Sequence, residues 1–341
     1  MTRTSTHRYD RTVILGVERV EAPVVVTSAE LDERLSEVYR RTRLRPGLLE
    51  GLVGIHERRR WADDEAFTDG AVAAGKAALA SAGVAPAQVD LLVNTSLSRR
   101  WLEPSTAVVI HDALGLSPGC QNFDVTNACL GFMNGMEIAG AMIEAGMIDV
   151  ALVVDSEDSQ PVQESTMRRL SAEGVTSRDL MSEFAALTLG SGAVAMVLGR
   201  ADHHPEGHAL VAGVSRAAAQ HHALCVGDND TMKTDLKGLL EAGLELSTEL
   251  WDAASSEFGW DTDISRYFLH QISQVHTDAI CERLKIDPER VPRSFPRFGN
   301  IGPASVAFTL AGETGSLDPG DRVLLMGIGS GLNASCVEVR W

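Results

Sequence analysis

The chain has 341 residues, of which 44% are hydrophobic and 23% are charged, as expected for a globular protein with a sizeable core. Its net charge of −17 opposes general binding to nucleic acid. No apolar run approaches the roughly 18 residues that a membrane span needs, and no apolar segment of a secretion signal follows the first residues. We therefore expect a cytoplasmic protein without a membrane span.

The chain contains five cysteines, which are Cys120, Cys129, Cys225, Cys281 and Cys336. Their odd number, their wide spacing and the lack of a CxxC pair argue against a disulfide framework or a zinc site. We therefore expect no bound metal, and each cysteine is first interpreted as a buried apolar side chain.

Charge is distributed unevenly along the chain. Residues 1–100 contain 15 Lys and Arg against 14 Asp and Glu, whereas the remaining residues contain 15 against 33. The basic groups of the first part cluster as RRTRLR at 40–45, as ERRR at 57–60, and at Arg99 and Arg100. These arginines form either a solvated surface or a binding site for an anionic small molecule, and both interpretations stay open here.

Strand-like and helix-like segments alternate from residue 90 onward. The predicted strands span 90–96, 121–126, 148–157 and 191–200. The predicted helices span 104–115 and 129–146, and each ends at a glycine, Gly115 or Gly146. This alternation predicts an α/β fold that is layered around buried strands.

Two similar segments close the two parts of the chain. LTLGSGAVAMVLGR ends at Arg200, LMGIGSGLNASCVEVRW ends at Trp341, and their Gly-Ser-Gly turns lie 139 residues apart. A duplicated α/β unit explains this repeat. The predicted halves span 1–200 and 201–341, with the polar segment 203–208 at the boundary. The polar stretch 158–184 is interpreted as an insertion that caps one face.

The sequence GIGSGL at 327–332 partly resembles the glycine fingerprint of dinucleotide-binding loops. That fingerprint requires a glycine at its sixth position and a helix after it. Leu332 occupies the sixth position, and the residues that follow alternate as in a strand. The sequence therefore predicts no dinucleotide site at this turn.

Cys129 lies where the strand-like DVT segment is followed by the helix-like CLGFMNG segment. A cysteine at a helix N-terminus experiences the positive end of the helix dipole and free backbone N–H groups. The position therefore predicts a stabilised thiolate, which is a better nucleophile at neutral pH. The alternative is a structural cysteine, because cysteines are common in protein cores.

Two further polar residues occupy positions where α/β folds place functional groups. His270 follows the apolar strand YFL, at the carboxyl end where such folds bind ligands. Asn300 lies between two glycines in FGNIGPAS, and Pro303 opens a helix after it. Such a loop can present a fixed amide donor. Each residue also has a structural alternative, as a satisfied buried histidine and as an ordinary turn asparagine.

Together these motifs resemble the thiolase-fold condensing enzymes of the ketoacyl synthase III type. The similar segments, in the order of that family, are LVGIHERRRW, NACLGF, LHQ, GNIGPAS and the C-terminal GIGSGLNASCVEVRW. The similarity extends from about Gly54 to Trp341. It implies a layered αβαβα thiolase fold of two duplicated halves, coenzyme A thioesters as substrates, and no cofactor.

The resemblance also implies a role for each residue of the site. Cys129 holds one acyl group as a thioester, and the backbone N–H groups of Cys129 and Ser330 form the oxyanion hole. His270 and Asn300 donate hydrogen bonds to the carbonyl oxygen of the second thioester while its α-carbon becomes an enolate.

Within this group the chain is most similar to the OleA-type thiolases of bacterial long-chain olefin biosynthesis, through NTSLSRRWLEPSTA, FDVTNACLGFMNGM and FGNIGPAS. The resemblance implies that two fatty acyl-CoA molecules are joined head to head to give a 2-alkyl-3-ketoacid. OleA-type sequences have an acid at the position of Glu103, and ordinary ketoacyl synthase III sequences do not. Without loss of CO₂, this condensation needs a base for the α-proton, and a carboxylate in an apolar pocket can serve.

Glu103 therefore has two interpretations. A glutamate just before a proline at a helix start is favoured by the helix dipole alone, without any catalytic role. The resemblance implies instead that Glu103 is the base, on a loop that reaches into the neighbouring subunit of a homodimer.

The same resemblance implies a function for the basic segment near the N-terminus of the chain. Coenzyme A carries phosphates, which arginine forks bind well. Arg58, Arg59 and Arg60 are the first candidates for this contact, and Arg216 is a weaker one. The overall negative charge opposes an acidic carrier protein as partner and favours coenzyme A thioesters as donors.

Three alternatives remain beside head-to-head condensation. One is a decarboxylating synthase III that uses malonyl carrier protein and gives Glu103 no chemical role. Another is an enzyme of secondary metabolism that passes an acyl group from Cys129 to an oxygen or nitrogen acceptor. The last is a scaffold subunit for downstream enzymes of a lipid pathway, in which Cys129 is dispensable.

Overall fold

The computed structural model describes residues 5–341. Within these residues a ten-stranded sheet has the strand order β12-β13-β14-β9-β2-β8-β7-β5-β6, and β1 pairs with β9 beside this path. The strands are β1 (Ser5–Arg8), β2 (Thr12–Glu21), β5 (Leu91–Asn94), β6 (Gln121–Asp124), β7 (Val150–Glu157), β8 (Gly192–Arg200), β9 (His208–Ala217), β12 (Arg266–Leu269), β13 (Arg322–Gly329) and β14 (Asn333–Arg340).

The two parts of the sheet repeat one pattern of strand directions. In the first part, β5 is parallel to β6 and β7, while β8 is antiparallel to both β7 and β2. In the second part, β12 is parallel to β13, while β14 is antiparallel to both β13 and β9. The antiparallel pair β7–β8 in the first part corresponds to the pair β13–β14 in the second part. The Gly-Ser-Gly turns found in the sequence adjoin β8 and β14. The predicted boundary between halves falls between β8 and β9.

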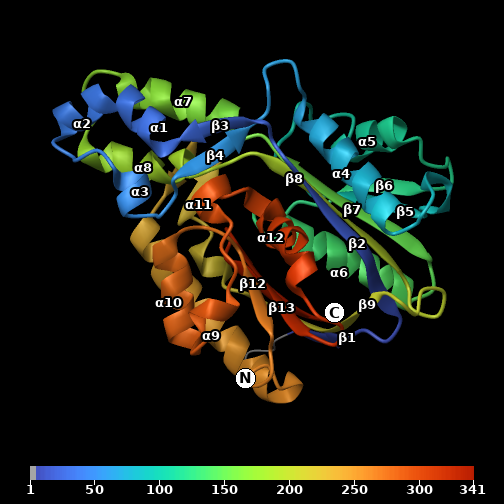
Figure 1. Cartoon of the computed structure of the whole chain (residues 1–341). Coiled ribbons are helices and arrows are strands. Elements are labelled where there is room, and N and C mark those ends of the chain that lie inside the picture. The colour runs from blue at the N-terminus through green and yellow to red at the C-terminus, as the bar shows by residue number, and fades with distance from the viewer. Residues whose placement is uncertain (1–4) are drawn as a thin grey trace.

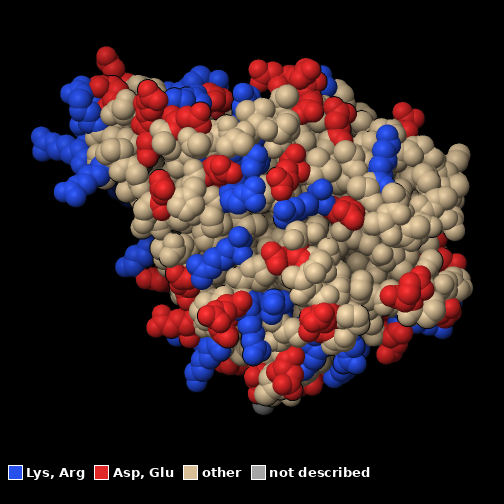
Figure 2. Space-filling view, in the orientation of Figure 1, with Lys and Arg blue, Asp and Glu red and all other residues tan. Residues whose placement is uncertain are grey.

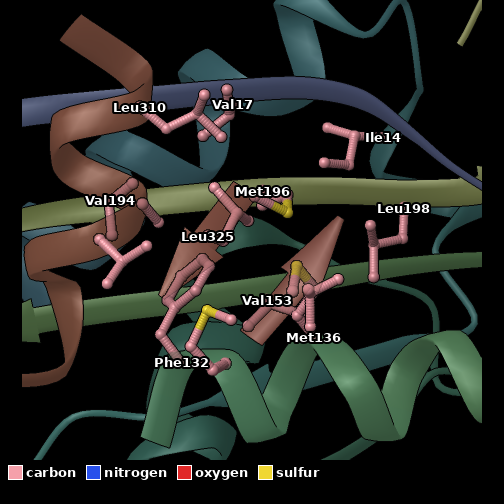
Figure 3. Close-up of a cluster of buried hydrophobic side chains, with 14 of the residues drawn as sticks. Ile14, Val17, Phe132, Met136, Val153, Val194, Met196, Leu198, Leu310 and Leu325 are labelled. Atoms are coloured by element: carbon pink, nitrogen blue, oxygen red, sulfur yellow. The ribbon is translucent and has the colours of Figure 1, made fainter. Parts of the chain in front are cut away.

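Two helices lie between the two parts of the sheet and form the central layer (Figure 1). They are α6 (Gly131–Glu144) and α12 (Ser305–Glu313). Their apolar side chains share one buried cluster with strands from both parts of the sheet. Figure 3 shows Phe132 and Met136 of α6, Leu310 of α12 and Leu325 of β13 around the β8 residue Met196.

Helices also cover the two outer faces of the sheet. The helices α4 (Phe67–Ser81) and α5 (Thr106–Leu114) pack on the first part, and α9 (Leu236–Phe258) and α10 (Gln274–Leu284) pack on the second part. The molecule is therefore layered helix, strand, helix, strand, helix, as predicted from the sequence. Among residues 5–341, no helix combines the length and the apolar character that crossing a membrane requires.

A helical cap lies beside the first part of the sheet, at the upper left of Figure 1. It consists of α1 (Ser28–Arg34), α2 (Ser36–Thr42), α3 (Leu48–Gly51), α7 (Gln160–Ser171) and α8 (Ser177–Leu187), which share an apolar cluster of their own. The polar stretch 158–184 supplies α7 and most of α8, so it packs with residues from the start of the chain.

The remaining elements are short and connect the layers. Two small sheets pair β3 (Val24–Thr27) with β4 (Glu57–Arg60) and β10 (Cys225–Gly227) with β11 (Met232–Thr234). The helix α11 spans Phe295–Phe298, and single 3₁₀ turns span Pro86–Gln88, Ala219–His221, Pro288–Arg290, Gly302–Ala304 and Thr314–Ser316.

The central layer depends on close packing around α6, which generates a stability prediction. Met136 is fully buried between the two parts of the sheet. Met136→Ala removes buried thioether contacts and leaves a cavity, so we expect the free energy of unfolding to fall by about 2–5 kcal/mol in denaturant titrations. The matched control is Met147→Ala just after α6, where the side chain is 66% exposed, with an expected change of about 0.5 kcal/mol or less. Equal effects of the two substitutions would contradict this picture of the core.

Candidate active site

Four segments that are distant in sequence meet at the N-terminal ends of the two central helices. His270 follows β12, and its backbone N–H donates to Met326 of β13 at 2.9 Å. A Cβ on Gly329, at the end of β13, would lie 3.2 Å from the Cys129 nitrogen. A Cβ on Gly131, at the start of α6, would lie 3.5 Å from Cβ of Pro303. The structure therefore brings together the segments that contain Cys129, His270, Asn300 and Ser330.

Cys129 lies on a tight turn between β6 and α6. Ala128 has a φ of 46°, and the turn is closed by hydrogen bonds from Leu130 N–H to Asn127 O and from Gly131 N–H to Ala128 O. The first helical residue is Gly131, so the helix begins two residues later than predicted and Cys129 precedes it. Glycine is needed at 131 because a Cβ there would lie 3.0 Å from the Thr95 carbonyl oxygen.

The surroundings of the Cys129 thiol oppose ionisation. Burial, with smaller contributions from the nearby groups Cys225, Glu157 and Asp155, raises the pKa of the thiol to about 12, although the backbone N–H of Cys129 acts to lower it. The predicted stabilised thiolate stays a prediction, because desolvation disfavours the anion while the backbone N–H of Cys129 favours it. Burial thus favours the protonated form of the Cys129 thiol.

His270 is a neutral imidazole at the carboxyl end of β12. It is 3% exposed, and burial, assisted by the neighbouring His276, lowers its pKa to about 3. Burial lowers the pKa of His276 to about 4. A cavity of about 30 Å³ adjoins both rings and the end of β13. A neutral imidazole has one N–H donor, which suits hydrogen bonding to a thioester oxygen.

Asn300 is held at both its backbone and its side chain. Its N–H donates to Thr188 O and its carbonyl accepts from Gly190 N–H, both at 2.9 Å. The side-chain Oδ1 accepts from Gly302 N–H at 3.0 Å and from Ser305 Oγ at 3.5 Å. These bonds occupy the oxygen end of the amide, so Nδ2 is the end that is directed away from its own loop as a donor.

A chain of amide hydrogen bonds links the Cys129 turn to the turn that contains Ser330. Asn333 Nδ2 donates to Asn127 Oδ1 at 3.1 Å, and Asn127 Nδ2 donates to Asn134 Oδ1 at 2.8 Å. Asn134 Nδ2 then donates to Glu137 Oε2 at 3.0 Å. The carboxylate of Glu137 only accepts hydrogen bonds, so it determines which group donates and which accepts at each step of this series of hydrogen bonds. The two segments with the proposed oxyanion donors are thus fixed relative to each other.

Glu103 does not cap the helix that follows it. The helix α5 begins at Thr106, where Ser105 is the N-cap and Asp124 accepts the N–H groups of Thr106 and Ala107 at 3.0 and 2.8 Å. Within residues 5–341 no hydrogen bond or ion pair holds the Glu103 carboxylate, which is exposed on the loop before α5. Other groups satisfy those donors, so Glu103 makes no hydrogen bond at the start of α5, and the choice between a dipole effect and a catalytic base stays open.

Arg58 does not fit the predicted contact with coenzyme A phosphate. It is fully buried and donates to Ser28 Oγ at 3.1 Å and to Leu187 O at 3.2 Å. Burial lowers the pKa of its guanidinium to about 10. This prediction is corrected, because successive residues of β4 alternate in direction and Arg58 faces the interior.

The other candidate arginines lie closer to solvent, and each is paired with an acid. Arg59 contacts Glu57 at 3.1 Å, Arg60 contacts Asp63 at 2.8 Å and Arg216 contacts Glu249 at 2.6 Å. Their contact with coenzyme A stays a prediction. The RRTRLR cluster belongs to the cap, and Figure 2 shows Lys and Arg projecting at the end of the molecule where Figure 1 places α2.

Two buried carboxyl groups beside the site were not predicted from the sequence. Asp155 and Glu157 are buried at the end of β7, and both influence the Cys129 thiol. The available signal was two acids at the carboxyl end of a buried strand in an α/β fold. Among the described residues, no group of three or more His, Cys, Asp or Glu side chains is arranged to hold a metal ion.

Comparisons with known proteins agree with this arrangement. The family model of 3-oxoacyl-[acyl-carrier-protein (ACP)] synthase III matches residues 123–215, and the model of its C-terminal part matches residues 259–341. An acyl-CoA:acyl-CoA alkyltransferase from Xanthomonas campestris is 44% identical, over 96% of this chain and 98% of its own length. The chain belongs to the OleA family of synthase III-type condensing enzymes. An acyl-CoA:acyl-CoA alkyltransferase from Shewanella oneidensis is 34% identical, over 98% of this chain and 100% of its own length.

Solved structures of OleA show the same fold. Xanthomonas campestris OleA with a serine in place of a cysteine, bound to lauric acid and lauroyl-CoA, matches with a TM-score of 0.95 and 42% identity, over 98% of this chain and 100% of that chain. The thiolase fold predicted from the motifs is therefore confirmed. As in other OleA and synthase III proteins, the chain is a condensing acyltransferase.

The burial of Cys129 predicts how its reactivity depends on pH. With a thiol pKa of about 12, the thiolate fraction rises about tenfold for each pH unit between pH 7 and 10. We expect the rate of iodoacetamide labelling at Cys129, followed by peptide mass spectrometry, to rise through this range without a plateau. Cys129→Ser identifies the labelled peptide by its loss. A plateau below pH 8 would show that the thiolate is stabilised after all.

Proposed function

We propose that the protein catalyses non-decarboxylative head-to-head Claisen condensation of two fatty acyl-CoA molecules to a 2-alkyl-3-ketoacid. The observation that carries this proposal is the carboxylate of Glu103, which is exposed on the loop before α5 and has no hydrogen bond or ion pair within the described residues. In the Xanthomonas enzyme, the glutamate that was substituted precedes the substituted cysteine by 26 positions. Glu103 precedes Cys129 by the same 26 positions.

The first half of the reaction loads Cys129. The sulfur attacks the thioester carbonyl of one acyl-CoA, and the thiol proton leaves with coenzyme A as the C–S bond to coenzyme A breaks. The negative oxygen of the tetrahedral intermediate accepts hydrogen bonds from the backbone N–H groups of Cys129 and Ser330. Such donors typically contribute about 3–4 kcal/mol to lowering the barrier. The product is an acyl thioester on Cys129.

The second half forms the carbon–carbon bond. Glu103 removes the α-proton of the second acyl-CoA, and the enolate oxygen accepts hydrogen bonds from His270 and from Asn300 Nδ2. The enolate carbon attacks the acyl carbonyl, the C–S bond to Cys129 breaks, the leaving thiolate takes up the proton that Glu103 removed, and a β-ketoacyl-CoA remains. Water then hydrolyses this thioester to release coenzyme A and the ketoacid. A neutral His270 suits this step, because it donates without giving up its proton to the enolate.

The substrate class is supported by the relatives. Proteins that are 44% and 34% identical are named as acyl-CoA:acyl-CoA alkyltransferases, and lauroyl-CoA is bound in a solved structure of one of them. A β-ketoacyl synthase III from Rhodospirillum rubrum is 29% identical, which gives the decarboxylating alternative less support. In our proposal the ketoacid passes to downstream enzymes of olefin formation.

We also propose that the working unit is a homodimer in which Glu103 serves the neighbouring subunit. The Glu103 loop exposes three large apolar side chains, with Leu97 41%, Trp101 50% and Leu102 90% exposed. The strand β6, next to the Cys129 turn, pairs only with β5 among the described strands, so one edge is open for another copy of the chain. Both features favour burial against a partner subunit.

Incubation with a single long-chain acyl-CoA tests the reaction. We expect release of coenzyme A together with a β-ketoacid, or the ketone formed by its loss of CO₂, without any malonyl donor. Glu103→Ala is expected to form the acyl-Cys129 adduct, visible by intact mass, and to lose condensation by about 100-fold or more. Glu173→Ala, an exposed acid on the cap, is the matched control and keeps full activity. A requirement for malonyl carrier protein would establish the decarboxylating alternative instead.

Mixing two inactive variants tests which subunit supplies Glu103. Cys129→Ala and Glu103→Ala are each expected to be inactive in condensation. When they are unfolded, mixed in equal amounts and refolded together, half of the dimers combine both variants. Each mixed dimer then contains one complete site, so activity returns to about one quarter of that of the unsubstituted enzyme. Activity that stays absent in mixed dimers, verified by native mass spectrometry, would place Glu103 in the site of its own subunit.

A further inference from the structure

Two carboxyl groups at the carboxyl end of β7 have no part in the proposed reaction. Asp155 and Glu157 are two positions apart on one strand, so their side chains lie on the same face. Asp155 is fully buried and Glu157 is 8% exposed. Burying two acids beside each other is costly, so their retention requires a compensating set of contacts.

Glu157 clamps the beginning of the loop that carries Glu103. Its Oε1 accepts from Leu97 N–H at 2.6 Å, and its Oε2 accepts from Ser98 N–H at 3.1 Å and from Ser98 Oγ at 2.6 Å. Ser98 Oγ in turn accepts from Asp158 N–H at 2.8 Å. One carboxylate thus holds two backbone donors and one hydroxyl of the loop, five residues before Glu103.

The same side chain adjoins the other segments of the site. A Cβ on Gly302 would lie 3.7 Å from Cγ of Glu157, which places Glu157 against the loop that orients Asn300. Its charge also reaches the Cys129 thiol. Glu157 is therefore the one side chain for which the described contacts join the Glu103 loop, the Asn300 loop and the nucleophile.

Asp155 lies beside Glu157 on the same face of β7. It accepts a hydrogen bond from Thr95 Oγ1 at 2.5 Å, and burial raises its pKa well above the ordinary value, with the Glu157 carboxyl as the next cause. Burial also raises the pKa of Glu157 to about 7. Burial and the neighbouring Glu157 carboxyl therefore both favour the neutral form of Asp155, whose Oδ1 has no hydrogen-bond partner among the described residues, while Glu157 accepts the hydrogen bonds of the loop.

We propose that Glu157 is a positioning residue, which holds the loop from Leu97 onward so that Glu103 is presented to the α-carbon of the second acyl-CoA. This inference rests on the proposed role of Glu103 as the base. It predicts that loss of the clamp affects the condensation step and spares the loading of Cys129, because loading does not use Glu103.

Glu157→Gln tests the clamp while keeping the shape of the side chain. We expect condensation from the preformed acyl-enzyme to fall about tenfold or more, because a carboxyl group whose two oxygens accept from three donors is replaced by an amide with one acceptor oxygen. Acylation of Cys129 from acyl-CoA is expected to stay within about twofold or to become faster, since a charge that raises the thiol pKa is removed. Equal losses in both steps would contradict the positioning role.

The matched control is Glu144→Gln on α6. Glu144 also holds a loop through two backbone donors and one hydroxyl, from Asp10 N–H at 3.2 Å, Arg11 N–H at 2.8 Å and Thr12 Oγ1 at 2.7 Å. It lies outside the described site. We expect it to leave the ratio of condensation to acylation unchanged, whatever it does to stability.

Hydrogen exchange reports on the loop directly. We expect peptides covering 97–104 to exchange about tenfold faster or more in Glu157→Gln than in the unsubstituted protein, and to be unaffected in Glu144→Gln. Ser98→Ala removes only the hydroxyl from the clamp, and it gives a smaller change in the same direction if Glu157→Gln does not fold. Unchanged exchange together with unchanged condensation in the folded variants would overturn the inference.

The outcomes separate this inference from the proposed function. If the unsubstituted protein does not condense two acyl-CoA molecules, the proposed function fails, and the clamp is then judged by hydrogen exchange alone. If condensation proceeds and Glu103→Ala abolishes it, while Glu157→Gln retains full condensation and normal loop exchange, only the role of Glu157 is lost.

Discussion

The packing of α6 and α12 between the two parts of the sheet is the constraint on which the site depends. The helix α6 begins directly after the Cys129 turn, and α12 begins after the Asn300 loop, so each functional segment is held by a buried helix. The close approach of the layers demands small residues there. A Cβ on Gly135 would lie 2.7 Å from the Thr95 side chain, which in turn hydrogen-bonds Asp155. The close packing of the central layer therefore also holds the functional segments in place.

Burial in this central layer favours the neutral forms of Cys129, His270 and Asp155. The low dielectric raises the pKa of Cys129, lowers that of His270 and raises that of Asp155. A condensation creates negative charge only briefly, on an oxyanion, an enolate oxygen and a leaving thiolate. Fixed N–H donors stabilise such charges more strongly in a dry site than in water. In the proposed reaction, neutral Cys129 and His270 are thus combined with donors that act as the charge develops.

Local patterns predicted the elements and the order of the site residues. The helix predicted at 104–115 is observed as Thr106–Leu114. Its signals are local, because the apolar spacing lies within the helix and Gly115, with a φ of 65°, ends it. Properties that depend on distant segments were not predictable. The pKa of Cys129 depends on Glu157 and Cys225, and the burial of Arg58 depends on the pleat of β4 against the cap. Three adjacent arginines look alike in sequence, but a strand alternates their directions.

The exposure of Glu103 to water limits the strength of its carboxylate as a base. A carboxylate in water is a weak base toward an unactivated α-carbon, and removal of water strengthens it by raising its pKa. Within one chain the Glu103 loop is solvated, and Leu102 beside it is 90% exposed. Covering these apolar side chains with a second subunit would remove water from the carboxylate at the same time. In this proposal the surface that drives association is also the surface that activates the base, so a free subunit can load Cys129 but lacks the environment for condensation.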